Sequence, residues 1–496
     1  MFAIRAARMF DGLRLRTGPL VLVDGDRIAD VDFTGAEPPD GYQLIDLADA
    51  TLLPGLIDTH MHLVFNASTD PPGHLETVSD DALFDEVRAA GRTALDAGIT
   101  CVRDLGDRSF LGVRLRAETA AHPELGPDVV PAGPPITVPA GHCWFLGGAV
   151  SGVDGVKQAV RAHAERGAAV IKVMVTGGRM TNGIAVDACQ FSAEELRAAA
   201  DEAHRLGLPI TGHAHGRDGI VAAMEAGFDG VEHASFLTPR GLEPDPKVIE
   251  ALAATGTVVS SGMPGTVPGV PLPPEMAPMM GQARELVRSA VEAGVRFVIG
   301  PDAGIAPHRP HYVLPYAVAD TAQIMGSAEA LSAATYHAAA ACNLGDRKGR
   351  LAPGLDADIL AVEGDPVADI TAIHRRVAVF HRGVPVAAAG SAQAAGSGLL
   401  LEKSFRMSKH DLQARPIYHH LRDSIEAHLT IVFAALAVSR WIEHQTGWSI
   451  RKFVKTARRY RTIEIQAGQH TITAADPLPA DLRGALDQIH RRSAAH

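Results

Sequence analysis

A repeated pattern of polar and apolar positions runs through the middle of the chain: an amphipathic stretch, a glycine, then a short apolar run. It recurs in segments such as AERGAAVIKVMV and HRLGLPITGHAH. A glycine just past a helix supplies the left-handed residue that ends it, and a nearly continuous apolar run is typical of a buried parallel strand. The glycines of the repeat are Gly98, Gly167, Gly207, Gly227, Gly256 and Gly294.

The number of these units favours a closed parallel barrel. LLPGLIDTHMH precedes them and DVVPAGPP lies between the first two, which gives about eight strand–helix units. We therefore predict an α/β fold with a (β/α)8 TIM barrel over residues 59–345, and a doubly wound open sheet is the alternative. Residues 192–206 show the expected helix, with Ser192 as its cap and acidic residues in its first turn.

Short β-type runs separated by Gly and Asp turns flank the barrel region on both sides. We expect residues 1–58 and 346–390 to pair into one small β-sandwich. A stretch rich in Ala, Gly and Ser follows and predicts a linker at 391–400. The remaining residues, 401–496, form a separate α-rich C-terminal extension.

Composition is ordinary for a globular protein of 496 residues, with 46% hydrophobic and 21% charged positions. The longest apolar run, residues 431–438, is far shorter than the ~20 residues of a membrane span. The first residues lack the features of a signal peptide, and the four cysteines show no disulfide or metal spacing. We therefore expect a cytoplasmic protein with reduced thiols and no membrane partner.

A histidine, lysine or aspartate recurs at one position of the repeat, five to eight residues after the glycine of its unit. With strands of about five residues, this position lies at or just past the strand end, where a barrel collects its catalytic groups. His60 and His62 end the first strand in the same way. The full set is His60, His62, Lys172, His213, His233 and Asp302.

These residue types in this arrangement indicate a site for two metal ions. Alternate residues of a strand face the same way, so His60 and His62 can share one ion. Four histidines and an aspartate suit Zn²⁺ or a similar divalent ion. A free ammonium on Lys172 would be repelled there, whereas a lysine carboxylated on its ε-amine presents two oxygens and bridges two cations. A hydroxide shared by the ions would attack a carbonyl, with Asp302 passing the proton to the leaving nitrogen.

Each residue also has a structural interpretation when it is taken alone. A histidine in an HxH motif is commonly a packing or surface residue, Lys172 would be a buried ion-paired lysine, and Asp302 would be a turn residue. Their joint occurrence at one position of the repeat, on separate strands, favours a functional site.

The motifs LLPGLIDTHMH, VIKVMVTGG, ITGHAHG, VEHASF and VIGPDAG resemble the amidohydrolase superfamily, in the branch of imidazolonepropionase-related and Xaa-Pro dipeptidase-like enzymes. The resemblance covers roughly residues 1–390. It implies one metal held by the two histidines of the HxH motif and by the aspartate, a second held by the two later histidines, and a bridging lysine. The matching residues here are His60, His62 and Asp302, then His213 and His233, then Lys172.

Three further residues are predicted to bind substrate. His142 lies in the loop PAGHCWFLGG, and His215 lies one pleat beyond the first histidine of ITGHAHG. Arg103 ends the second strand, where a structural role is favoured over a contact with substrate. The paired glycines of VTGG are expected to let the backbone approach the metals closely.

The C-terminal segment differs from the rest in charge and pattern. From Gly396 onward there are 15 Lys and Arg against 9 Asp and Glu, whereas the preceding residues carry 31 against 48. A helical pattern followed by a hairpin resembles the end of a DDE insertion-sequence transposase, with Glu426 as its metal-binding glutamate. The two aspartates that would complete that site are absent, so we expect no transposase activity. Weak nucleic-acid binding by the tail is less favoured than a solvated basic face.

The sequence therefore predicts a binuclear metal-dependent amidohydrolase that cleaves the C–N amide bond of a dipeptide or an N-acyl amino acid. A cyclic-amide or imidazolone-type hydrolase or a deaminase is the first alternative, and such enzymes do not need Lys172. A lactone or phosphoester hydrolase on the same centre is the second. A nucleic-acid-binding fusion through the tail is the non-enzyme alternative, and a homo-oligomer is left open.

Overall fold

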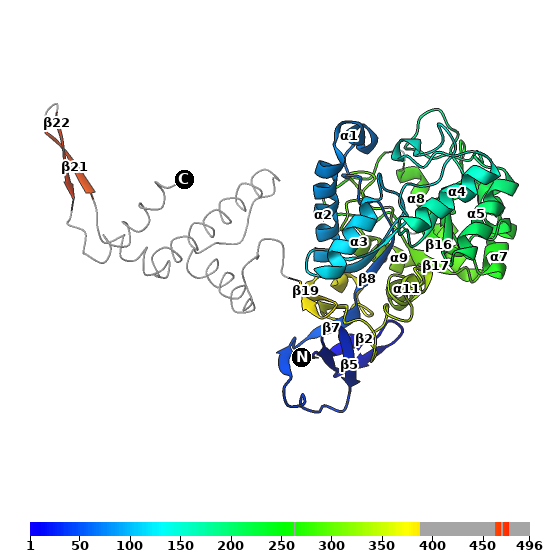
Figure 1. Ribbon diagram of the computed structural model, residues 1–496. Coiled ribbons are helices and arrows are strands. Elements are labelled where there is room, and N and C mark those ends of the chain that lie inside the picture. The colour runs from blue at the N-terminus through cyan, green and yellow to red at the C-terminus, as the bar shows by residue number, and fades with distance from the viewer. Residues whose placement is uncertain (262, 275, 387–461, 468–469, 476–496) are drawn as a thin grey trace. The chain divides into compact units, whose positions relative to one another are not determined.

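The computed structural model describes residues 1–386 apart from 262 and 275, together with 462–467 and 470–475 (Figure 1). The chain divides into two units, Met1–Gly390 and Ser391–His496. In the second unit β21 (Thr462–Ala467) and β22 (His470–Ala475) pair antiparallel, which confirms the predicted hairpin. The predicted linker at 391–400 and the predicted helix with Glu426 lie outside the described residues.

Within the described part of the first unit, eight parallel strands form two sheets. One sheet has the order β10-β9-β8, and the other has the order β11-β12-β13-β16-β17. The strands of both sheets are short and almost wholly buried, as the apolar runs predict. Their bounds are β8 Leu56–Met61, β9 Ile99–Asp104, β10 Asp128–Pro131, β11 Ile171–Met174, β12 Ile210–Ala214, β13 Gly230–His233, β16 Val258–Ser261 and β17 Phe297–Ile299.

Isolated residue pairs, rather than continuous ladders, join the edges of these two sheets. Met61 of β8 pairs with Ala303, just past β17, and Ile136 pairs with Val173 of β11. The backbone N–H of His62 donates to the carbonyl of Ala303 at 2.9 Å. The parallel strands agree with the predicted barrel, but among the described residues they do not form a single closed ladder.

Helices alternate with the parallel strands, and Figure 1 shows them on the outside of the sheets. Ser192 and Glu195 form a capping box at the start of α5, which confirms the predicted cap. The six glycines of the repeat all have φ between 70° and 89°, the left-handed conformation expected after a helix. The helices are α1 Pro71–Thr77, α2 Asp80–Asp96, α3 Leu111–Ala121, α4 Gly152–Glu165, α5 Ala193–Arg205, α6 Arg217–Glu225, α7 Pro246–Thr255, α8 Met280–Glu292, α9 Leu314–Met325, α10 Ser327–Ala333 and α11 Tyr336–Ala341.

Strands from both ends of the first unit form two further sheets, with the orders β5-β4-β1-β6 and β20-β19-β18-β7-β2-β3. In the second of these, β7 pairs with β18 from more than 300 residues further along. Buried side chains from both sheets, among them Ile4, Val21, Leu52 and Phe380, form one cluster. The strands are β1 Phe2–Arg5, β2 Arg8–Phe10, β3 Leu15–Thr17, β4 Leu20–Asp24, β5 Arg27–Asp32, β6 Gln43–Asp46, β7 Ala50–Pro54, β18 Ile359–Glu363, β19 Arg376–His381 and β20 Val384–Pro385.

One predicted boundary falls within a strand. The division between residues 58 and 59 falls inside β8, because this strand begins at Leu56 and pairs in parallel with β9 from that residue. Only Gly55 separates β8 from β7, so the chain passes from the flanking sheet to the barrel strands without a loop. The sequence LLPGLID gave no composition break that would mark this junction.

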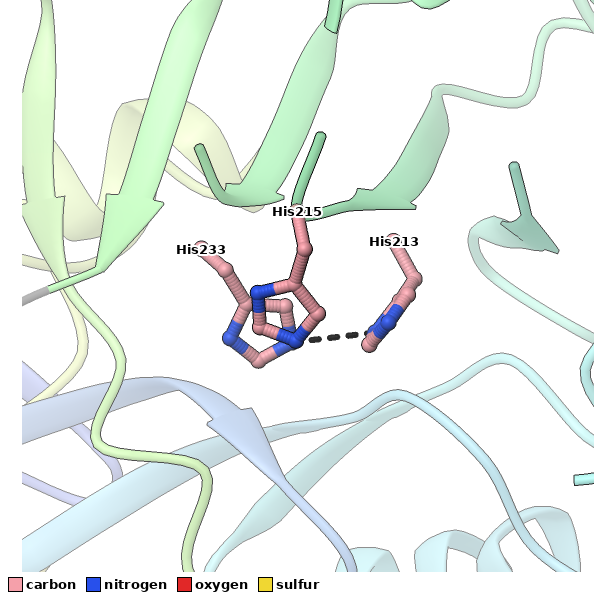
Figure 2. A group of neighbouring side chains, drawn as sticks. All are labelled: His213, His215 and His233. Carbon is pink, nitrogen blue, oxygen red and sulfur yellow. Dashed lines mark hydrogen bonds between the residues drawn. The ribbon is translucent and has the colours of Figure 1, made fainter. Parts of the chain in front are cut away.

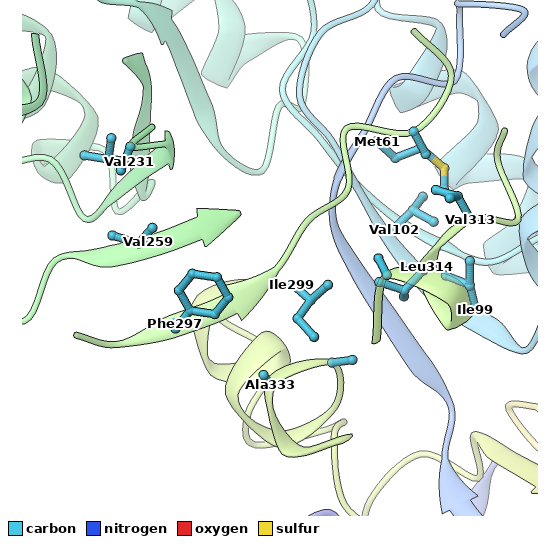
Figure 3. Packing of buried hydrophobic residues seen from close by; sticks show 14 of the residues in the cluster. Met61, Ile99, Val102, Val231, Val259, Phe297, Ile299, Val313, Leu314 and Ala333 are labelled. Carbon is cyan, nitrogen blue, oxygen red and sulfur yellow. The ribbon is translucent and has the colours of Figure 1, made fainter. Parts of the chain in front are cut away.

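The main hydrophobic core lies between the parallel strands and the helices that follow them. Figure 3 shows Val231 on β13, Val259 on β16, and Phe297 and Ile299 on β17, together with Met61 and other core residues. No helix in the described part of the chain is long and apolar enough to cross a bilayer.

Candidate metal centre

The register of the parallel strands places the predicted site residues at one end of the sheets. Met174 of β11 pairs with His213 of β12, and Ala214 pairs with His233 of β13. Because the strands are parallel, their carboxyl ends meet at the same edge. All six predicted metal ligands line one cavity of about 240 Å³: His60, His62, Lys172, His213, His233 and Asp302.

His60, His62 and Asp302 form the first group of this cavity. Nε2 of His60 lies 3.5 Å from Asp302 Oδ1, and Nε2 of His62 lies 3.3 Å from the same oxygen. Nδ1 of His62 donates to the carbonyl of Gly106 at 3.0 Å, which leaves Nε2, the nitrogen that faces Asp302, as the ring atom that could bind a metal ion. Burial raises the pKa of Asp302, but His60, His62 and Arg309 outweigh it and hold this pKa well below its usual range.

His213, His215 and His233 form the second group (Figure 2). Nε2 of His213 donates to the carbonyl of Gly177 at 3.0 Å, and its Nδ1 lies 3.0 Å from Nε2 of His233. Burial, followed by repulsion from neighbouring histidines, holds the pKa of both His213 and His233 well below the usual value. Two uncharged imidazoles therefore face each other through ring nitrogens, an arrangement that suits a shared cation.

His215 lies closer to the metal ligands than a substrate contact requires. Its ring stacks on His233 with centroids 4.5 Å apart, and its Nδ1 is 2.8 Å from Ser235 Oγ. A ring nitrogen of His215 lies within 4.8 Å of those of His213 and His233. The sequence assigned His215 to substrate, and the geometry leaves it able to serve either as a ligand or as a substrate contact.

Lys172 is 1% exposed, and its Nζ has no hydrogen-bond partner in the described part of the chain. Burial lowers its pKa to about 8, although Glu232 and Asp302 oppose that shift. An unpaired buried ammonium is costly, so this lysine is poorly explained as a structural residue. The alternative of an ion-paired core lysine lacks the partner it needs.

The donor set fits divalent cations of borderline softness. His60, His233 and Asp302 offer ligand atoms within 4.8 Å of one another, as do the three histidines of the second group. The rings of His60 and His233 lie 4.9 Å apart between centroids, so the two groups adjoin. Imidazole nitrogens with a carboxylate are the ligands that Zn²⁺ takes in hydrolytic sites.

His142 lines the same cavity, as predicted for a substrate contact. Its ring centroid is 4.7 Å from that of His213, and its Nε2 is 3.6 Å from Cys143 Sγ. Burial, with repulsion from Lys172, lowers its pKa to about 4, so the imidazole is neutral near pH 7. A Cβ added at Gly178 would lie 2.2 Å from His142 Nε2, which shows how closely the VTGG backbone approaches the site.

The structure places Arg103, a predicted substrate contact, outside the cavity of the histidines. Arg103 is 4% exposed and does not line that cavity. Its Nε donates to the carbonyl of Thr59 at 2.7 Å, and its Nη2 donates to Glu232 Oε1 at 2.9 Å. These contacts favour the structural interpretation of Arg103.

Glu232 is a site residue that the sequence interpretation missed. Its Oε2 lies 3.0 Å from Nδ1 of His60, on the opposite side of that ring from Asp302. A glutamate within the apolar strand VEH, next to His233, is the signal that was available in the sequence.

Two arginines were also missed, and both line the cavity. Arg309 donates to the carbonyl of Pro301 at 2.7 Å, and its Nη1 lies 3.6 Å from Asp302 Oδ2. Its buried Nε has no hydrogen-bond partner among the described residues. Arg179 is exposed in the loop after β11. Both arginines lie in loops that follow a strand. In such loops the sequence alone does not distinguish an arginine that binds substrate from one that is exposed to solvent.

A larger cavity of about 1070 Å³ lies elsewhere in the first unit. It is lined by the first residues of β12, β13, β16 and β17, including Ile210 and Gly230, and therefore lies at the opposite ends of the strands. None of the six predicted ligands lines it. The functional cavity is therefore identified by the residues that line it and not by its volume.

Residues 51–386 match the amidohydrolase family. The chain belongs to this family. The match spans both groups of histidines, Lys172 and Asp302, and it makes the chain an enzyme that hydrolyses carbon–nitrogen bonds. The match ends before residues 401–496, so the resemblance of that segment to a transposase gains no support.

Individual relatives of this amidohydrolase agree with the family match. Ochratoxinase of Aspergillus niger is 29% identical over 414 residues, which cover 75% of this chain and 82% of that protein. Imidazolonepropionase of Paracoccus denitrificans is 27% identical over 354 residues, covering 66% and 82%. The solved structure of a Xaa-Pro dipeptidase with methionine in its active site has a TM-score of 0.68 at 26% identity, covering 77% of this chain and 99% of its own.

Replacing Gly178 with Ala should impair the amidohydrolase by displacing His142, since the added Cβ would lie 2.2 Å from Nε2. A displacement of about 1 Å at a positioning group can cost on the order of 100-fold, so we expect a loss of that size in kcat/KM with metal content unchanged. Gly281→Ala, where the added Cβ meets nothing within 4 Å, is the control. Wild-type kinetics in Gly178→Ala would remove His142 from the substrate site.

Proposed function

We propose that the chain is a binuclear metal-dependent amidohydrolase that cleaves the C–N amide bond of a dipeptide or an N-acyl amino acid. The observation that carries this proposal is Lys172, a buried lysine that lines the cavity together with both histidine groups and whose Nζ has no hydrogen-bond partner among the described residues. Its charge contributes to the lowered pKa of His60 in the first group and of His233 in the second. A mononuclear centre has no use for a lysine at this position.

Carboxylation of Lys172 would resolve the unfavourable burial of its ammonium. A pKa of about 8 leaves part of the side chain as the neutral amine near neutral pH, and only that form reacts with carbon dioxide. The product carries a negative charge and two oxygens in place of a positive charge. With two oxygens, this group would be able to serve as a ligand shared by the two histidine groups.

The residues that would hold the ions are those whose free ring nitrogens and carboxylate oxygens meet in the cavity. His60, His62 and Asp302 would hold one ion, His213 and His233 the other, with Lys172 shared. When bound, the ions supply Lewis acidity that polarises a carbonyl and lowers the pKa of a water molecule.

The remaining steps belong to side chains of this protein. Asp302 has one carboxylate oxygen toward the histidines and the other toward Arg309, so it can accept a proton from the attacking water and deliver it to the leaving nitrogen. His142 is neutral and faces the cavity, where its ring N–H can donate to the substrate.

The lining of the cavity supports a substrate with a carboxylate and a bulky apolar part. Arg179 and Arg309 supply positive charge, and arginine binds carboxylates through parallel N–H donors. Sulfur-containing and aliphatic side chains also line the cavity, including Met180, Leu242, Met276 and Met279. Methionine adapts its shape to irregular apolar groups, so these side chains suit a large acyl or side-chain group. A cyclic amide is the second candidate, because imidazolonepropionase is among the relatives.

Replacing Lys172 with Ala should remove bound metal and activity together, because both ions lose a shared ligand. We expect activity to fall by at least about 1000-fold, and short carboxylic acids such as acetate or propionate to restore part of it by filling the space of the missing carboxylate. The exposed Lys247→Ala is the control. Full activity in Lys172→Ala would rule out the bridging role.

Replacing Arg179 with Met should weaken binding of substrates that carry a free carboxylate. A hydrogen bond to a charged group contributes about 1.5–3 kcal/mol, so we expect KM to rise by roughly 10- to 100-fold for an N-acyl amino acid with little change in kcat. The same substrate with its carboxylate capped as an amide should be affected far less. Arg197→Met, an exposed arginine on α5, is the control. Equal effects on both substrates would contradict the assignment.

A further inference from the structure

Glu232 is a fully buried carboxylate beside the candidate metal centre. One of its oxygens, Oε1, accepts from Arg103 Nη2 at 2.9 Å and from Thr211 Oγ1 at 2.7 Å. The other oxygen, Oε2, lies 3.0 Å from Nδ1 of His60. Three different strands, β9, β12 and β8, therefore supply the partners of a single side chain on β13.

The contact between Glu232 and His60 is exclusive on both sides. Within the described residues, neither Oε2 of Glu232 nor Nδ1 of His60 has another polar partner. The 3.0 Å contact departs from the ideal hydrogen-bond direction, yet buried polar atoms are almost always paired, and here each has only the other. A carboxylate next to Nδ1 keeps the ring proton on that nitrogen.

The tautomer of His60 follows from this contact. A neutral imidazole has one N–H donor and one lone pair, so a proton on Nδ1 leaves the lone pair on Nε2. Nε2 of His60 is the nitrogen that faces Asp302, at 3.5 Å. His62 reaches the same state by donating its Nδ1–H to the carbonyl of Gly106, a neutral acceptor.

Of His60 and His62, His60 is therefore the one whose ring orientation depends on a charged partner. Glu232 forms an ion pair with the buried guanidinium of Arg103 at 2.9 Å and accepts from Thr211 at 2.7 Å, so the partner of His60 is a carboxylate held in place by two other strands. The second contact of Arg103, to the carbonyl of Thr59, joins this arrangement to the backbone residue just before His60.

We propose that Glu232 is a positioning residue that holds the His60 ring with Nε2 as the metal-binding atom, and that Arg103 and Thr211 fix the carboxylate for this task. The inference rests on the proposed binuclear centre. A carboxylate behind a metal-bound histidine fixes its ring and raises its basicity, and loss of such a partner weakens metal binding by about 10- to 100-fold. The effect should fall on the ion held by His60 and leave the ion held by His213 and His233 nearly unchanged.

The competing interpretation is that Glu232 only neutralises the buried Arg103. A buried charge left without its partner is strongly destabilising, so a single substitution does not separate the two roles. Replacing both residues does separate them, because the double variant Arg103→Met/Glu232→Gln removes the charge imbalance and still removes the carboxylate from His60.

The test is a chelator-competition titration of Zn²⁺ with the full-length protein, the Glu232→Gln variant and the double variant. We expect two ions with wild-type affinity in the parent protein, and in both variants one ion bound about 10- to 100-fold more weakly with the other unchanged. Glu202→Gln is the matched control, because Glu202 is also buried and bonded to two arginines, Arg161 and Arg205, but lies on α5.

Two outcomes would overturn the inference. If the double variant binds both ions as the parent does, Glu232 serves only to neutralise Arg103; this holds even if the single variant does not fold. If Glu232→Gln folds and keeps both affinities, the carboxylate does not act on His60. A parent protein that binds fewer than two ions instead contradicts the proposed function, so the two failures are distinct.

Discussion

The site depends on one constraint: several imidazoles are packed against each other out of water and must remain uncharged. His213 has ring centroids of His142, His215 and His233 within 4.7 Å, and the pKa of each of these histidines is lowered by burial. Protonating any one of them would place a charge beside its neighbours. The ring-nitrogen lone pairs of these histidines are therefore unprotonated at neutral pH and are available to bind metal cations.

Two carboxylates lie on opposite sides of the His60 ring. Asp302 lies on the cavity side of His60, and Glu232 lies on its far side, paired with Arg103. Within the residues that the structure describes, Nζ of Lys172 has no hydrogen-bond partner. A free lysine would add a positive charge to a site already suited to cations, whereas a carboxylated lysine would supply the negative charge that the ligand set lacks.

Much of this could be predicted from the sequence because the relevant signal was periodic. Glycines at helix ends and side chains at a fixed distance after them gave the strand register, and that register brought the six ligands to one cavity. What was missed depends on three-dimensional context. Arg103 and Glu232 point away from the cavity into the core, and only the distance between them shows that they form a pair.

The fold was predicted from the same periodic signal. The prediction of boundaries departed from the structure where the sequence carries no local signal. The strand β8 begins without a loop after β7, so composition could not mark the domain boundary. Isolated residue pairs join the two parallel sheets, and these pairs involve residues just past β10 and β17. The sequence pattern does not predict the backbone path of those residues. Residues 391–461 carry predictions that lie outside the described residues.

The number of metal ions bound per chain tests the central claim most directly. The purified full-length protein, supplied with excess Zn²⁺ and bicarbonate and then freed of unbound metal, would be measured by elemental analysis against protein concentration. The account predicts about two ions per chain, since six ligands including a bridging lysine serve two ions. A value of one or fewer, in protein that hydrolyses its substrate at full rate, would contradict it.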